Sequence, residues 1–299
     1  MKKVLIVINS YSISENIIYK STRLKEELLK YKIESDIVKA NQLLVKTKGN
    51  ELDLEYLTDY YFAIYLDKDN YLAKAISLKI PLYNNYESLI LSDDKMLSIL
   101  NLYNSNIKAP LTISCPLCYI DEPKVDEVKL FLDDVEKALS YPMVFKLTHG
   151  SLGKQVFLIN NRKELEEYYS MYKKVPHIYE EYLNYHIGDD YRVIVVGDEV
   201  IASMERVNKN DFRSNIALGG KGYDVTNTLN DSYKQLAIKA AKCLKLDYAG
   251  IDIAKGKDDE PIFIEANGNA FFTEIEKVTS INIASHFIKY ILRKEKIID

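Results

Sequence analysis

The chain has 299 residues, 47% hydrophobic and 28% charged, which is ordinary globular usage and long enough for two or three compact domains. Its net charge is −4 with both signs interspersed, so we expect no nucleic-acid partner, because phosphate contacts need a basic surplus on one face. Its apolar runs are too short to span a membrane, and Met-Lys-Lys followed by five apolar residues is too short for a signal peptide, so we expect a cytoplasmic protein with no membrane partner.

The first ninety residues alternate strand-like and helix-like segments. Residues 3–8 form an apolar strand run, and residues 15–31 have helical spacing. We expect one side of that helix to carry Ile17, Ile18, Leu24, Leu28 and Leu29. Further strand runs at 33–38, 62–66 and 82–83 predict a small parallel, Rossmann-like sheet over residues 1–90. The first strand-to-helix turn, residues 9–14, lacks GxGxxG, which argues against dinucleotide binding there.

A second segment, predicted as a domain over residues 91–176, contains a candidate phosphate-binding hairpin. Ser92-Asp-Asp94 is a helix N-cap pattern before a helix at 95–103, Pro110 opens a strand, and residues 126–139 form an amphipathic helix. A strand ending in Lys146 is followed by a Gly-Ser-rich turn and a second strand at 155–159. Backbone N–H groups of such a turn can cradle phosphates, and Lys146 adds a point charge. The alternative is a flexible hairpin with a surface lysine.

The spacing of Cys115-Pro-Leu-Cys118 is that of a CxxC motif. No second pair follows it, and the four scattered histidines supply no evident ligand set. We therefore interpret the cysteines as ordinary thiols rather than as a zinc or redox site.

The third segment, predicted as a domain over residues 177–299, begins with a strand at 178–183. Residues 189–196 and 199–205 read as a hairpin across Gly197-Asp198, and helices are expected at 231–244 and 281–293. Arg206 and Arg213 lie in or beside the polar loop between the hairpin and the first of these helices. Two arginines near a phosphate would suit a transition state in which charge rises. Their alternative role is that of solvated loop charges.

The most informative stretch is residues 248–270, where two apolar runs flank a charged turn at 255–260. If the runs pair as a hairpin, Asp252 lies beside Glu265 and Asn267 on adjacent strands. Three oxygen ligands at the end of a sheet suit Mg²⁺, which is usually held by few carboxylates plus substrate phosphates. The alternative is an ordinary hairpin with polar ends.

Eight motifs, in order, resemble those of the ATP-grasp ligases, and among them the RimK-type amino-acid (glutamate) ligases. They are Asp94-Lys95, Phe145-Lys146 with Gly150-Ser-x-Gly153, Glu180-Glu-Tyr-Leu183, Asp190-Tyr-Arg192, Glu205-Arg206, Asp211-Phe-Arg-Ser-Asn215, Ala249-Gly-Ile-Asp252 and Ile264-Glu-Ala-Asn267. The resemblance covers roughly residues 90–290. It implies an α/β protein in which an ATP-grasp fold follows the N-terminal Rossmann-like sheet.

The resemblance also implies a role for each motif. The phosphates of ATP would be bound by Lys95 and Lys146, with Gly150, Ser151 and Gly153 closing over them. The adenine would be bound by the backbone of Glu180, Glu181, Tyr182 and Leu183, and the ribose by Asp190. Near the γ-phosphate would lie Arg213, Ser214 and Asn215. Arg206 and Arg213 would be the catalytic residues. Asp252, Glu265 and Asn267 would hold Mg²⁺, or alternatively Mn²⁺.

The implied reaction joins a carboxylate to an amine through an acyl phosphate and releases ADP, with an amino acid as donor or acceptor. Expected partners are a small-molecule carboxylate and amine, a peptide or carrier protein being a further option, and a second copy of the chain in a homo-oligomer. The loop after the metal motif, Asn267-Gly-Asn-Ala-Phe-Phe272, departs from the Ser-Pro-Gly type common in the family, which leaves the acceptor open. So does the absence of a basic residue at Ala217-Leu218 before Gly219-Gly220. The alternative function is a non-catalytic ATP-binding regulatory module on the same fold.

Overall fold

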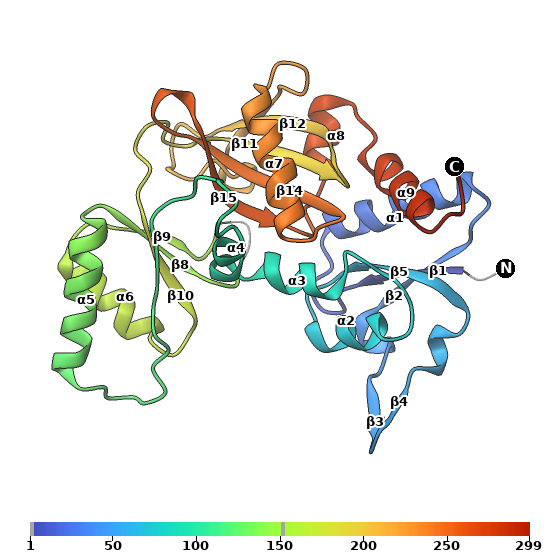
Figure 1. Ribbon diagram of the computed structural model, residues 1–299, viewed down its shortest axis with the longest axis horizontal. Coiled ribbons are helices and arrows are strands. Elements are labelled where there is room, and N and C mark those ends of the chain that lie inside the picture. Colours follow the sequence, from blue (N-terminus) through green and yellow to red (C-terminus); the bar gives the residue numbers. More distant parts are fainter. Residues whose placement is uncertain (1–2, 151–152) are drawn as a thin grey trace.

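The computed structural model describes residues 3–150 and 153–299. These residues form three larger sheets, each covered by helices, and one small exposed hairpin (Figure 1). In Figure 1 the N-terminal sheet lies below helices α1 and α9, the central sheet with α5 and α6 lies on the opposite side, and the C-terminal sheet lies above and between them. Within the described ranges, no helix is both long and apolar enough to cross a membrane.

The N-terminal sheet is parallel, as predicted. Its strands β1 (Lys3–Ile8), β2 (Ser35–Lys39), β5 (Tyr60–Leu66) and β6 (Leu82–Tyr83) have the order β2-β1-β5-β6. Two helices follow strands in this domain, α1 (Glu15–Lys30) and α2 (Asn70–Ser77). The predicted apolar face of α1 was partly wrong: its buried stripe contains Ile17, Leu24 and Leu28, whereas Ile18 and Leu29 are exposed. The charged hairpin β3 (Lys46–Lys48) and β4 (Glu51–Asp53) was not predicted, because Leu52 is the one apolar residue of its two strands and gives no alternating pattern.

The central sheet contains the predicted hairpin. Strands β7 (Thr112–Ser114), β8 (Met143–Leu147), β9 (Val156–Ile159) and β10 (His177–Glu181) are antiparallel in the order β7-β10-β8-β9, and α5 (Val125–Leu139) and α6 (Arg162–Tyr172) accompany them. Because β10 pairs with β8, this sheet crosses the predicted domain boundary at 176/177.

The segment leading into the central sheet contains two helices rather than the single one expected, α3 (Tyr86–Asp93) and α4 (Lys95–Asn101). Of the predicted Ser92-Asp-Asp94 cap, Asp94 caps α4 by accepting from the Leu97 N–H at 3.0 Å, and the other two residues end α3. The first predicted domain boundary, at 90/91, therefore falls inside a helix.

The C-terminal sheet is antiparallel, with the order β13-β12-β11-β14-β15. Its strands are β11 (Asp189–Val196), β12 (Glu199–Val207), β13 (Lys221–Asp224), β14 (Tyr248–Lys255) and β15 (Pro261–Asn267), and its helices are α7 (Asp231–Cys243), α8 (Thr273–Thr279) and α9 (Ile283–Lys294). Short 3₁₀ turns occur at Ala40–Gln42, Glu55–Leu57, Ile216–Leu218 and Lys257–Asp259. Strand β13 and helix α8 were not predicted.

Side-chain alternation along β11 explains how one sheet serves both core and site. Successive strand residues point to opposite faces. Val193 and Val195 pack with α7 in one core cluster, whereas Ile194 and Val196 pack in the cluster shared with α9 and the N-terminal domain. Asp190 and Arg192 point to the same face of the sheet as Ile194, but they line a cavity and do not pack in the core. This face of β11 is therefore apolar in the core and charged at the cavity.

The loop after β15 is anchored to the N-terminal domain at three consecutive residues. The buried side chain of Asn84 donates to the carbonyl of Gly268 at 2.6 Å, and Asn269 Nδ2 donates to the Asp67 carbonyl at 3.0 Å. The buried Lys20 ammonium donates to the Ala270 carbonyl at 2.9 Å, and it lies 4.3 Å from the centre of the Tyr248 ring. Burial lowers the pKa of Lys20 to about 7.

Candidate active site

A cavity of about 520 Å³ opens between the central sheet, the C-terminal sheet and the carboxyl ends of the N-terminal strands. Most of the predicted site residues line it, namely Lys146, Gly150, Gly153, Glu180–Leu183, Asp190, Arg206, Arg213–Asn215, Asp252, Glu265 and Asn267. Lys95 contacts this set through its ammonium, which lies 3.8 Å from Glu265. Ser151, also predicted to bind ATP, lies outside the described residues. The N-terminal domain contributes Asn9, Ser12, Ser14, Asp67 and Lys68.

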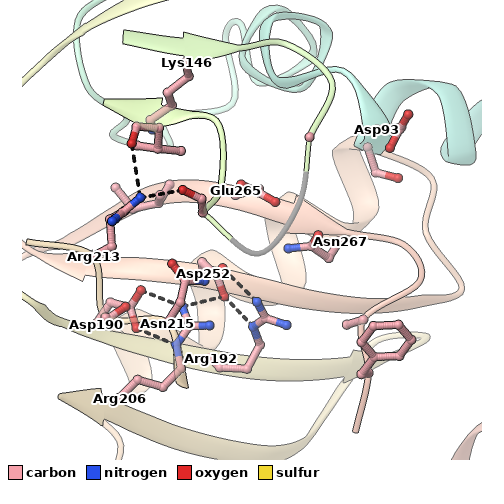
Figure 2. A pocket seen from close by; sticks show the side chains of 18 of the residues that line it. Asp93, Lys146, Asp190, Arg192, Arg206, Arg213, Asn215, Asp252, Glu265 and Asn267 are labelled. Atoms are coloured by element: carbon pink, nitrogen blue, oxygen red, sulfur yellow. Dashed lines mark hydrogen bonds and ion pairs between the residues drawn. The ribbon is translucent and has the colours of Figure 1, made fainter. Parts of the chain in front are cut away.

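Two rows of paired charges cross the C-terminal sheet. Strand register places Arg206 opposite Asp190 and places Arg192 opposite Asp252. The Arg206 guanidinium binds Asp190 at 2.7 and 2.6 Å and reaches Asp252 at 3.1 Å. Arg192 binds both oxygens of Asp252, with Nη2 to Oδ2 at 2.8 Å. Figure 2 shows these four side chains in succession along the cavity wall.

The electrostatics of this network follow from burial and pairing together. Burial by itself raises the pKa of Asp252, but Arg192 and Arg206 outweigh it and hold the pKa below the ordinary range. Burial lowers the pKa of Arg206, and Asp190 and Asp252 reverse that and raise it. These shifts favour the charged forms of Asp252 and Arg206. Arg206 is a residue of β12, only 5% exposed, and not the solvated loop charge that was one of its two predicted roles.

Lys146 and Glu180 form a buried ion pair between neighbouring strands. Lys146 lies in β8 and Glu180 in β10, and the exposed fractions are 8% and 3%. The predicted adenine-binding strand ends at Glu181, so Tyr182 and Leu183 follow it instead of extending it. The pair fixes one cation in the wall of the cavity, where it can meet a polyanionic ligand.

The turn of the β8–β9 hairpin is connected to the polar loop through Arg213. Its Nη1 donates to the carbonyls of Gly153 at 2.7 Å and Val156 at 3.3 Å, while Asp211 holds the same guanidinium at 2.7 Å. Gly153 has φ +70°, and a Cβ there would stand 2.8 Å from Asn215 Oδ1. On the other side, Lys95 Nζ lies 3.3 Å from the Gly150 carbonyl. Glycine at 153 thus permits a close approach of the turn to Arg213 and Asn215.

The predicted metal ligands lie on adjacent strands. Asp252 pairs directly with Glu265, and Asn267 lies opposite Gly250, two residues from Asp252 along β14. Asp252 Oδ1 accepts from both arginines, but Oδ2 accepts only from Arg192 and keeps a lone pair. In the described part of the chain, the only ion-pair partner of the Glu265 carboxylate is Lys95. Two carboxylates and one amide fit a hard cation such as Mg²⁺. Within residues 3–150 and 153–299, no three His, Cys, Asp or Glu side chains gather as a metal site.

The sequence patterns missed two groups of cavity residues. Arg192 was seen only as part of a motif, although its i, i+2 spacing from Asp190 on a strand places both on one face. Asn9, Asp67 and Lys68 follow N-terminal strands, where ligands bind in open α/β sheets, and that rule was the available signal.

An antiparallel sheet and a hairpin-bearing second sheet that enclose a cavity between them, behind a small parallel domain, define the ATP-grasp fold. The RimK-like ATP-grasp domain matches residues 92–291, and the chain belongs to this family.

Named relatives and solved structures agree with that assignment. The chain is 30% identical to a probable alpha-L-glutamate ligase of Mannheimia succiniciproducens, over 72% of this chain and 68% of the relative. It is 38% identical to ribosomal protein bS6–L-glutamate ligase of Escherichia coli, over 51% of each, so the match spans about half of that relative's length. The fold of D-alanine–D-alanine ligase from Bacillus anthracis, solved with ATP, superposes with a TM-score of 0.72 at 19% identity, over 99% of this chain and 100% of that one.

Proposed function

We propose that the protein is an ATP-dependent carboxylate–amine ligase that forms an amide or peptide bond and releases ADP, with an amino acid as donor or acceptor. One observation carries this proposal: a single cavity joins the Lys146–Glu180 end to the N-terminal residues Asp67 and Lys68. At about 520 Å³ it is of the size that holds small ligands, and the N-terminal end offers further polar groups beyond those proposed for the nucleotide.

Each group has a place in the proposed chemistry. Lys146, Lys95 and the turn at Gly150 and Gly153 would bind the phosphates, Glu180–Leu183 the adenine, and Asp190 the ribose. Arg213, Ser214 and Asn215 would surround the γ-phosphate. Asp252, Glu265 and Asn267 would hold Mg²⁺, which when bound supplies neutralising charge at the phosphates. Arg192 and Arg206 keep Asp252 ionised and fixed in position.

The reaction balances in two displacements. A carboxylate oxygen of the first substrate attacks the γ-phosphorus of ATP, the bond to the bridging oxygen breaks, and ADP leaves. The amine of the second substrate then attacks the carbonyl carbon of the acyl phosphate, phosphate leaves, and the amine nitrogen loses a proton. The contribution of the protein is to position the reactants and to stabilise the developing charge with Arg206 and Arg213.

A screen for ADP release tests this proposal. Purified protein with ATP and Mg²⁺ is given each L-amino acid singly and in pairs, and ADP and phosphate are measured. We expect ADP release that depends on an added amino acid. Tight ATP binding with no ADP release from any mixture of the screen would instead support the alternative, a regulatory module that binds ATP without catalysis.

Further aspects of the proposal concern context. A homo-oligomer, a cytoplasmic location, the use of Mn²⁺ and a peptide or carrier-protein partner stay predictions. Light scattering of the purified chain tests the first, and replacing Mg²⁺ with Mn²⁺ in the ADP assay tests the third.

A further inference from the structure

The cavity contains a buried carboxylate that the nucleotide chemistry does not use. Asp67 follows β5, at the carboxyl end of a parallel strand, and is only 5% exposed. It lines the N-terminal end of the cavity together with Asn9 and Lys68. The carboxyl ends of parallel strands are where open α/β sheets bind ligands.

The two oxygens of Asp67 differ in their contacts. Oδ1 accepts from Asn9 Nδ2 at 2.8 Å and from the Lys68 backbone N–H at 2.7 Å. Oδ2 has no hydrogen-bond partner in the described part of the chain, and no Lys, Arg or His nitrogen there lies within 4.0 Å of either oxygen. The nearby ammonium of Lys68 is instead paired with Asp93, which also lines the cavity and is labelled in Figure 2.

Asp67 is an exception among the buried carboxylates of residues 3–150 and 153–299. The other five each have a cationic nitrogen within 4.0 Å: Glu27 with Lys30, Glu180 with Lys146, Asp247 with Lys294, Asp252 with Arg192, and Glu276 with Arg23. Removing a charge from water without a partner is costly, which is why buried charges are normally paired. The cation that Asp67 lacks can be supplied by a ligand in the cavity.

The surroundings of Asp67 fit a ligand that lies next to the reacting groups. Asn269 donates to the backbone carbonyl of Asp67 at 3.0 Å, and Asn269 is two residues beyond Asn267, one of the proposed metal ligands. A substrate held at Asp67 therefore lies beside the loop that connects it to the metal end. The group of this substrate that binds Asp67 would be a positively charged hydrogen-bond donor, and a primary ammonium is such a group.

We propose that Asp67 binds the ammonium group of the amino-acid substrate and so selects amino acids over acids that lack the amine. The proposal rests on the ligase function above, and it assigns the substrate class and the residue that recognises it. Asn9 and the Lys68 N–H hold Oδ1, which leaves Oδ2 to accept from the ammonium.

Direct binding tests the subsite independently of catalysis. Each L-amino acid is titrated into the full chain with ADP and Mg²⁺ in a calorimeter, and so is the 2-hydroxy acid that matches any amino acid that binds. We expect binding of at least one amino acid, and affinity at least about tenfold weaker for its hydroxy analogue, because a charged hydrogen bond is lost. In Asp67→Asn, which keeps the acceptor for Asn9 but loses the charge, the amino acid should bind at least about tenfold more weakly while ATP affinity stays within about twofold.

A matched control is Asp59→Asn, which removes the same charge from the exposed position just before β5 and should leave both affinities unchanged. Absence of binding by every amino acid, or equal binding by wild type and Asp67→Asn, would overturn the subsite. Equal affinity of the amino acid and its hydroxy analogue for the wild type would also overturn it, and that comparison needs no variant. Binding as expected without any ADP release would instead contradict the ligase function alone.

Discussion

The two ends of the cavity differ in whether their buried charged side chains are paired. At the proposed nucleotide end, Lys146 pairs with Glu180, and Arg206 pairs with Asp190 and Asp252, across neighbouring strands. At the N-terminal end, Asp67 is buried without a cation among the residues that the structure describes. The charges of a paired network are satisfied and held in position before any ligand binds. A buried charge without a partner instead favours binding of a ligand of opposite charge. The difference separates the proposed nucleotide end, whose charges are paired in advance, from the proposed substrate end, whose carboxylate would select the ligand.

The largest effect is expected where the paired network is broken. Arg206→Met leaves Asp190 without its cation and removes one of two from Asp252, so we expect the free energy of unfolding to fall by about 3–5 kcal/mol. Urea unfolding measures it. The same substitution at Arg162, which pairs with three carboxylates on the surface, should cost no more than about 1 kcal/mol. Similar losses for the two variants would mean that the buried network contributes no special stability.

Glu265 is intermediate between the paired buried charges and the unpaired Asp67. It is half-buried, and its one cation within the described chain, Lys95, lies 3.8 Å away. Glu265→Ala should reduce ADP release at least about a hundredfold while changing the free energy of unfolding by less than about 1 kcal/mol. Glu260→Ala, at the other end of the same hairpin and paired with Lys108, serves as the control and should retain activity. Full activity of Glu265→Ala would remove it from the metal site.

Lys20 extends the comparison to a buried cation with no carboxylate partner in the described residues. Burial lowers its pKa to about 7, whereas an unfolded lysine titrates near 10.4. Between these values the unfolded state binds more protons, so this group makes stability rise with pH. From pH 7 to pH 9, wild type should gain about 2 kcal/mol relative to Lys20→Met. Urea unfolding of both proteins at the two pH values gives the difference, and a constant gap would show that Lys20 is not shifted.

A smaller effect is expected where Arg213 binds the turn of the β8–β9 hairpin. Arg213→Gln loses the contacts to the Gly153 and Val156 carbonyls and to Asp211, so we expect the KM for ATP to rise about tenfold. Steady-state kinetics at saturating amino acid measures it. An unchanged KM together with a lower kcat would place Arg213 with the transition state rather than with ATP binding.

How much of this was predictable depends on which physical signal each element carries. The parallel N-terminal sheet, the β8–β9 hairpin and the pairing of Asp252 with Glu265 followed from apolar periodicity and turn residues, and the structure confirms them. Helix α3 and strand β13 were missed because they are short and weakly patterned. Ile18 and Leu29 are exposed, which shows that periodicity predicts the centre of the buried face of a helix but not where that face ends.

The site was predictable only where residues cluster in motifs. Lys146, Asp252 and Glu265 stand in such motifs, but the partner of each charge depends on strand register, which a sequence does not state. Asp67 stands in no motif, and its only sequence signal is its place directly after a parallel strand. Its importance arises from burial and from the missing cation, and both are properties of the folded chain.

Trapping with hydroxylamine tests the central claim, activation of a carboxylate as an acyl phosphate, most directly. The protein is incubated with ATP, Mg²⁺, hydroxylamine and the amino acid or pair of amino acids that supports nucleotide turnover, and hydroxamate and nucleotide products are quantified together. We predict hydroxamate and ADP in equal amounts, because hydroxylamine takes the place of the amine. Hydroxamate accompanied by AMP and pyrophosphate would mean activation by adenylation and would contradict the account.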